Sequence, residues 1–401
     1  MKPIKNNRKG SSAVFLTMIL AALVTITLAM VYSVKENAVA GIADGITELA
    51  CDSVMSEFDH KIQKDYGLFL IRGTDRELTA KINSYIDYSF DSLKSVEKGK
   101  VRVTASRFPV TDTELIRKQL LEHVKFMEIH DLIKKEENEG GSSMQDRKLL
   151  HGPTVASLPS AQVPEKSLTA LAGSIGENIS DVKEAFREGS EKYLINRYIL
   201  SYFNRRTHAV SEKHFFKNEV EYILGGKMTD RKNERKVKIA LEALRFPANL
   251  AHIYQDPEKK AAVLAAAELL TPGAGAATQL ALASTWAYAE SDNDVKLLWQ
   301  GHRVPAVKDR STWAVDLDSA VEGLTEGIMT PDTEKGYTYE EYLQILLFFQ
   351  DDNIKISRIL DLVQINMRKS CDRDFLIQEY SAGIAASAVI NGRVYSYEKK
   401  Y

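Results

Sequence analysis

The strongest hydrophobic pattern in the chain lies near its first residue. From Gly10 to Val34 there is no charged residue, and residues 13–33, AVFLTMILAALVTITLAMVYS, are apolar or uncharged throughout. A helix needs about 20 such residues to cross about 30 Å of hydrocarbon. The run is longer than the apolar core of a signal peptide, and it continues into a further helical pattern. We therefore predict an uncleaved transmembrane helix over residues 13–33.

A second periodic pattern follows this run directly. Apolar residues recur at steps of three to five, as on one face of a helix; they are Ile42, Ile46, Leu49, Val54, Phe58 and Ile62. The pattern predicts one continuous rod from about Ser12 to Lys64. Either the protein's own folded part or partner helices must cover these six residues, which makes them a candidate partner-helix face.

The rest of the pattern predicts an α+β fold dominated by helices. Helical periodicity extends over residues 75–97 and 112–135, and residues 68–71 and 101–108 read as strands. Asn391-Gly392 lies between two alternating runs, which is the strongest short signal for a hairpin. We expect this hairpin to join the two strands in one small antiparallel sheet beside the long N-terminal helix.

Composition divides the remaining chain. Residues 136–167 are rich in Gly, Ser and Pro and lack periodicity, so we expect a flexible insert. Residues 168–370 are expected to form a helical domain, and residues 371–401 a C-terminal strand and hairpin segment. The uncharged run at 275–289 is short for a membrane span, and a buried core helix is the preferred interpretation.

Charge gives the predicted span an orientation. Four basic residues and no acid precede it; they are Lys2, Lys5, Arg8 and Lys9. The positive-inside rule then places residues 1–12 in the cytoplasm as a basic tail and the bulk of the chain outside, beginning with a helix and α+β part at 34–135. We expect a single-pass protein of the cell membrane. The formal net charge of the chain is only -2, so nothing favours nucleic acid as a partner.

Few residues suggest chemistry. The two cysteines, Cys51 and Cys371, are expected to be buried thiols, although an oxidising compartment would permit a bridge. The pair Glu219 and Glu221 reads as ordinary surface carboxylates. No H-E-x-x-H, P-loop or G-x-S-x-G motif occurs, so we predict no catalytic, cofactor-binding or metal-binding residue and no enzyme activity. An anchored surface enzyme of unknown chemistry and a single-pass sensor or binding module remain alternatives.

The N-terminal plan of charged tail, apolar helix and amphipathic extension is similar to that of pilins and pseudopilins. Their pattern has a Gly before a cleavage point and a Glu five residues later. Here Gly10 precedes Ser11, which makes these two residues a candidate site of prepilin-type processing. The fifth position is Phe15, so this chain lacks the glutamate that is thought to pair with a neighbouring subunit.

A closer resemblance rests on residues 10–71, 215–254, 284–317 and 336–368. These stretches resemble an uncharacterised family of single-pass membrane proteins from Gram-positive bacteria, encoded among tight-adherence (Tad or Flp) pilus genes alongside TadE- and TadG-like pseudopilins. The resemblance implies a membrane-anchored extracytoplasmic structural or assembly component of a Tad-like (type IVc) pilus or secretion apparatus, with a minor pseudopilin as one such component. It implies machine components as partners, with self-association as a further option, and it assigns no catalytic residue.

Overall fold

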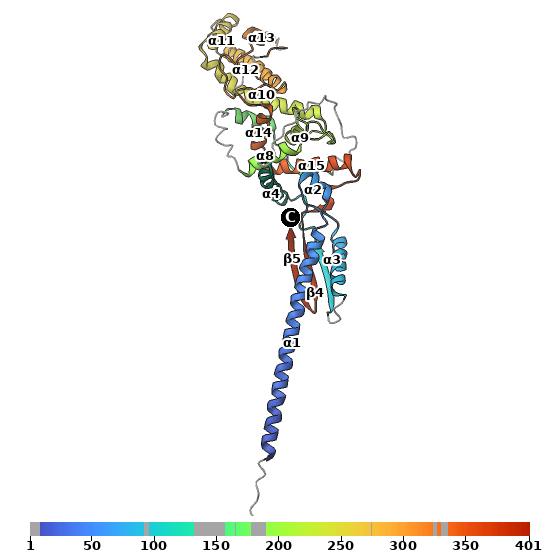
Figure 1. The fold of residues 1–401 in the computed structure, drawn as a ribbon. Helices are drawn as coiled ribbons and strands as arrows, with labels where there is room; N and C mark the ends of the chain where they lie inside the picture. The colour runs from blue at the N-terminus through green and yellow to red at the C-terminus, as the bar shows by residue number, and fades with distance from the viewer. Residues whose placement is uncertain are drawn as a thin grey trace, which may run out of the picture. The chain divides into compact units, whose positions relative to one another are not determined.

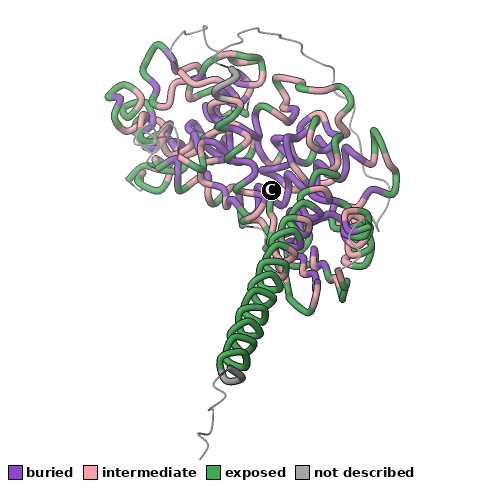
Figure 2. Tube along the Cα trace, turned by 60° about the horizontal axis from the view of Figure 1, so that its bottom comes forward, coloured by how far each residue is buried: buried purple, intermediate pink, exposed green. Residues whose placement is uncertain are grey.

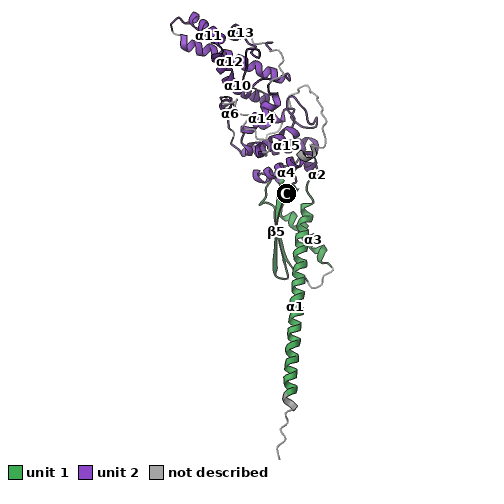
Figure 3. Cartoon of the chain, turned by 60° about the vertical axis from the view of Figure 1, so that its left-hand side comes forward, with its two compact units in different colours: residues 1–59, 70–109, 379–401 green, residues 60–69, 110–378 purple. Residues whose placement is uncertain are grey.

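A computed structural model describes residues 9–91, 96–131, 157–164, 166–177, 190–273, 275–323, 327–329 and 336–401, the side chains of 9–11 and 128–131 excepted. The chain divides into two compact units (Figure 3). Unit 1 contains residues 1–59, 70–109 and 379–401, and unit 2 contains residues 60–69 and 110–378. The predicted class is confirmed, since helices dominate both and the sheets are small and antiparallel.

Unit 1 combines a long helix with a three-stranded sheet (Figure 1). The helices are α1 (Lys9–Met55) and α3 (Asp75–Phe90), and the strands pair in the order β2 (Lys98–Thr104), β4 (Gly383–Ile390) and β5 (Arg393–Lys400). The predicted hairpin is confirmed. Asn391 and Gly392 have φ of 49° and 74°, the left-handed conformation that a two-residue hairpin turn requires.

The C-terminal hairpin was expected to share one sheet with the strand near residue 68, and the structure pairs these strands differently. A two-residue strand, β1 (Ile71–Arg72), pairs with β3 (Tyr380–Ser381), which precedes the hairpin. The hairpin itself pairs with β2, where Val103 lies opposite Ala386. The single predicted sheet is therefore two sheets.

The second half of α1 packs on its own unit, against α3, β4 and β5. Its buried positions recur at helical spacing and are mostly small; they are Ala43, Thr47, Ala50, Cys51, Val54 and Met55. The facing positions on β4 alternate and are also small or branched; they are Ile384, Ala386, Ala388 and Ile390. Small side chains on both sides let helix and sheet approach closely. The protein's own folded part, which was one of the two predicted alternatives, therefore packs on one face of this helix.

The predicted rod to Lys64 is wrong, because α1 ends at Met55 and a separate helix, α2 (His60–Tyr66), belongs to unit 2. Hydrogen bonds from distant residues turn the chain between them. Tyr85 on α3 donates to the Glu57 carboxylate (2.7 Å), and the backbone N–H of Asp59 donates to the Leu70 carbonyl (2.9 Å). These partners compete with continued helix.

Unit 2 is helical and has a nearly enclosed central helix, α15 (Asp352–Ser370). Helix α15 contacts α4 (Thr113–Asp131) and α9 (Glu219–Gly225). Besides these and α2, the unit contains the helices α6 (Leu168–Gly176), α8 (Glu191–Tyr202), α10 (Asp230–Gln255), α11 (Pro257–Leu270), α12 (Gly275–Trp299), α13 (Leu317–Glu322) and α14 (Tyr339–Phe349). The uncharged run at 275–289 lies in α12 and buries Ala283, Trp286 and Ala287, as a core helix should.

Two further expectations have different outcomes. Of the predicted insert, residues 136–156 and 165 lie outside the described residues, while Pro159–Gln162 forms a short 3-10 helix, η1, whose Ser160 N–H donates to Asp361 on α15 (3.0 Å).

Both cysteines are free thiols, and Cys51 is buried as predicted. Cys371 is exposed, contrary to the prediction, because it follows the last turn of α15, where the chain leaves the core.

Candidate membrane anchor and interaction surfaces

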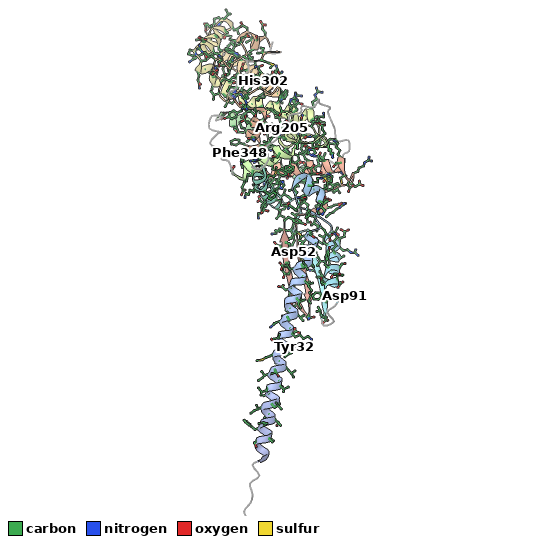
Figure 4. The ribbon with its side chains drawn as sticks, viewed as in Figure 1. Tyr32, Asp52, Asp91, Arg205, His302 and Phe348 are labelled. Atoms are coloured by element: carbon green, nitrogen blue, oxygen red, sulfur yellow. The ribbon has the colours of Figure 1, made fainter. Side chains whose placement is uncertain are left out.

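The first half of α1 is apolar and uncovered (Figure 2). It is the one helix of the described residues that is long and apolar enough to cross a membrane, and no part of its most apolar stretch is buried. Side chains such as Phe15 and Leu28 are exposed by 65% and 63%, and Tyr32, labelled in Figure 4, lies on the same uncovered part of α1. An apolar surface of this size on a soluble protein marks an interaction site.

The three threonines in this stretch find hydrogen-bond partners within their own helix. The hydroxyl groups of Thr17 and Thr25 each donate to a backbone carbonyl one turn earlier (2.8 Å), and Thr27 does the same (2.9 Å). Hydrocarbon offers no hydrogen bonds, so every polar group within it needs an internal partner. The threonines are therefore compatible with an apolar surrounding.

The six residues of the predicted partner-helix face do not share one surface. Ile42 and Leu49 are exposed by 45% and 61%, whereas Ile46 is half-buried and Val54 is fully buried in the core of unit 1. The other two lie beyond α1; Phe58 follows its end, and Ile62 is buried on α2.

Ile42 and Leu49 lie opposite the buried face of α1, on one strip with Gly41 and Gly45. A Cβ atom added to either glycine would meet nothing within 4 Å. Glycine inside a helix costs about 1 kcal/mol relative to alanine. The packing of unit 1 gives no reason for these two glycines. We call the surface formed by Gly41, Ile42, Gly45 and Leu49 the open strip.

The candidate processing residues, Gly10 and Ser11, lie in the first turn of α1. This turn precedes the exposed apolar residues directly. A peptidase acting between them would leave a new amino terminus at the start of the apolar stretch.

Unit 2 has an open groove of about 920 Å³ between α6, α10 and α12. Its wall is mostly apolar, with Phe246 and Leu250 from α10 and Tyr288 from α12, and Glu177 and Glu242 are the acids that line it. The Tyr288 hydroxyl donates to the Glu242 carboxylate across 3.4 Å. Such a wall suits an apolar group. Within the described ranges, no group of three or more His, Cys, Asp or Glu side chains is placed to hold a metal ion.

The acids at the start of α9 lie in the core, so the interpretation of Glu219 and Glu221 as surface carboxylates is wrong. Glu221 accepts hydrogen bonds from the Tyr339 hydroxyl (2.7 Å) and the Arg206 backbone N–H (3.1 Å), while its Oε2 has no partner among the described residues. Burial raises the pKa of Glu221 to about 7. Its partners are 118 and 15 residues distant, so the local sequence carries no signal of them.

The raised pKa of Glu221 predicts a pH-dependent stability. Between its ordinary pKa and about 7 the folded chain holds a proton that the unfolded chain releases, so stability falls as pH rises through this window. Glu221→Gln removes this dependence. We expect the unfolding free energy of wild type to fall relative to that of the variant by about 3 kcal/mol from pH 4.5 to pH 8. Urea unfolding followed by tryptophan fluorescence measures it, because all three tryptophans lie in unit 2.

Glu191→Gln, on an exposed position of α8, is the matched control and should track wild type at every pH. If Glu221→Gln also tracks wild type across the window, Glu221 is ionised in the folded protein and the prediction is wrong.

The fold and its exposed helix define the class of this protein: a helix-dominated α+β chain with one N-terminal helix able to span a membrane. Residues 134–392 match a family of unknown function, DUF5702. This match covers more than half of the chain, which therefore belongs to that family. No curated protein and no solved structure matches the chain. The family match begins after α1 and assigns no activity.

Proposed function

We propose that this protein is a membrane-anchored, extracytoplasmic structural or assembly component of a Tad-like pilus or secretion apparatus, either a minor pseudopilin-like subunit or a scaffold for the machine. One observation carries the proposal. A single helix, α1, is apolar and uncovered over its first half and forms the spine of a small α+β unit over its second half. Pilin-like subunits have this plan, in which one helix both anchors the subunit and supports its folded part.

The proposed orientation places the basic residues 1–12 in the cytoplasm, residues 13–33 in the bilayer and the rest of the chain outside. Partner contacts would then form outside the bilayer, where the open strip begins roughly 10 Å beyond Val34 at 1.5 Å per helical residue. Another α1 helix suits this strip, because glycines at positions 41 and 45 let two helix backbones approach closely.

Cys371 offers a test of orientation, because it is exposed while Cys51 is buried. A maleimide that cannot cross membranes is expected to label the protein on intact protoplasts, and Cys371→Ser is expected to abolish this label. Labelling that appears only after lysis would place unit 2 in the cytoplasm and contradict the proposal.

N-terminal sequencing tests the place in the apparatus. The protein is purified from its native membrane with the prepilin peptidase present and absent. A peptidase-dependent terminus at Ser11 would identify a processed subunit, despite Phe15 at the fifth position. An unprocessed terminus would identify a fixed scaffold, and copurification would then be used to find the machine component that binds it. Absence of every such component from the purified material would contradict the assignment to the apparatus.

A further inference from the structure

Unit 2 contains a buried group of four charged side chains that the proposed function does not use. Glu290 and Asp294 lie one turn apart on α12, and neither has exposed side-chain area. Lys308, from the segment that follows α12, inserts between them with a side chain that is 1% exposed. Its Nζ contacts Glu290 Oε1 and lies 2.5 Å from Asp294 Oδ1. An amine with two carboxyl groups at contact distance, away from water, is an arrangement for acyl transfer.

The two carboxyl groups have different surroundings. Asp294 Oδ2 accepts from Arg245 Nε (2.9 Å) and from Asn249 Nδ2 (3.0 Å). A buried guanidinium at this distance stabilises a carboxylate, and Lys308 and Arg245 lower the pKa of Asp294 against the opposing effect of burial. Asp294 is therefore held as a carboxylate, which can accept a proton but is a poor target for attack by the Lys308 amine.

Glu290 has the surroundings of an acyl donor. Its Oε2 accepts from the backbone N–H of Val315 (2.8 Å) and from that of Ala314 (3.3 Å), which is shared with Oε1 (3.2 Å). Two backbone donors aimed at one carboxyl oxygen stabilise the negative charge that develops there during nucleophilic attack. Burial raises the pKa of Glu290, which favours the neutral acid that an amine attacks.

Aromatic side chains close the site. The Lys308 ammonium lies 5.8 Å from the centre of the Trp313 ring, which meets Trp286 edge to face. Both indole N–H groups donate to the Val315 carbonyl (2.7 Å). These two bonds fix the segment that also supplies the two backbone donors to Glu290. The reacting groups are thus held in place and shielded from water.

We propose that Lys308 and Glu290 form an intramolecular amide bond, with Asp294 as the proton carrier. The Lys308 ammonium first gives one proton to the Glu290 carboxylate, which yields an amine and an acid. Nζ then bonds to Cδ of Glu290, and the carbonyl electron pair moves onto Oε2, where the two backbone N–H groups stabilise it. Asp294 Oδ1 takes a second proton from Nζ and delivers it to Oε1. The carbonyl re-forms as Oε1 leaves as water.

The step is balanced and needs no co-reactant. An ammonium and a carboxylate become an amide and a water molecule, while Asp294 and Arg245 end in the charge states in which they began. The product replaces two buried charges by one neutral group, which removes the cost of keeping them out of water. It closes a ring between positions 18 residues apart and ties the segment after α12 to that helix.

Peptide mass spectrometry of the full-length chain, purified in detergent, tests the bond. Trypsin would release residues 304–310 attached to residues 261–296, because an acylated Lys308 is no longer a cleavage site. The linked pair is expected to weigh less than its two peptides by one water, about 18 Da. Fragmentation between Ser291 and Asn293 assigns the link to Glu290. Unlinked peptides alone would overturn the proposal, and a link to Asp294 would overturn the assigned roles.

Three variants separate the roles. Glu290→Gln should release ammonia, about 17 Da, in place of water, which identifies the acyl donor. Asp294→Asn should lower the linked fraction at least tenfold while tryptophan emission stays native; an unchanged fraction would refute the proton carrier. Lys308→Arg keeps the charge and should give no link.

The chain also holds an internal control. Lys399 in unit 1 lies between Glu48 (2.9 Å) and Asp52 (3.0 Å), also one turn apart, but its side chain is 28% exposed. We expect trypsin to cleave at Lys399 fully. A link there of equal yield would show that proximity alone, and not the closed site, produces the bond.

Discussion

Ala388→Asp is expected to open unit 1 and expose Cys51 to solvent. Ala388 lies on the face of β4 that packs against α1, fully buried in the same core cluster as Cys51. An unpaired carboxylate at this position loses its hydration, at a cost of several kcal/mol, and finds no compensating partner in a core of Ile, Val and Ala side chains. The most direct relief is separation of the hairpin from the helix.

Thiol labelling measures this opening. In a Cys371→Ser background Cys51 is the sole cysteine, and burial raises the pKa of its thiol to about 11, so it reacts slowly while folded. We expect Ala388→Asp to raise the labelling rate at least tenfold. Ser387→Asp is the matched control, since the neighbouring position faces the other side of the sheet beside Arg102 and should label as slowly as wild type. Equal rates in both variants would mean that β4 does not cover α1.

The second large effect is expected from Arg245→Ala, which removes a buried positive charge and lowers the stability of unit 2. Arg245→Ala leaves Asp294 without its guanidinium and the Ala306 carbonyl without its donor (2.6 Å). Removing one partner of a buried ion pair costs about 3–5 kcal/mol. Asp294 keeps its contact with Lys308, but its Oδ2 loses the guanidinium, and the Ala306 carbonyl keeps no donor from Arg245. We expect the unfolding free energy of unit 2 to fall by about that amount.

Urea unfolding followed by tryptophan fluorescence again provides the measurement, since Trp286 and Trp313 lie beside this cluster. Arg235→Ala is the control, because Arg235 lies on the same helix and is exposed. It should change the free energy by less than about 0.5 kcal/mol. An Arg245→Ala midpoint equal to that of Arg235→Ala would show that the pair contributes nothing to stability.

Features fixed by local residues could be predicted from the sequence. The uncharged run at 13–33 and the Asn391-Gly392 turn depend on neighbouring positions, and both predicted elements are present. The end of α1 could not be predicted, because Tyr85 and Leu70 turn the chain from 28 and 11 residues away. The apolar spacing continues through that turn, so periodicity alone favoured a longer helix.

Of the candidate sites too, only those that depend on neighbouring residues could be predicted from the sequence. An exposed apolar helix is visible in composition, whereas the surroundings of Glu221 and Glu290 are not. A glutamate in a helical sequence reads as solvent-exposed by default. Its burial follows from distant partners, such as Tyr339 for Glu221 and the segment at 308–315 for Glu290. The burial of each acid is therefore visible in the structure and not in the sequence.

Unit 1 is built from residues that precede and follow those of unit 2, and this order has a consequence for folding during translation. The ribosome produces α1 first, but the strands that cover its second half, β4 and β5, come from residues 383–400 and are translated after all of unit 2. Domains fold as units as their residues emerge. Unit 1 is thus completed last, and until then Ala43, Ala50 and Val54 lack the strands that bury them. A nascent chain would expose this helix face to chaperones and proteases for most of its translation.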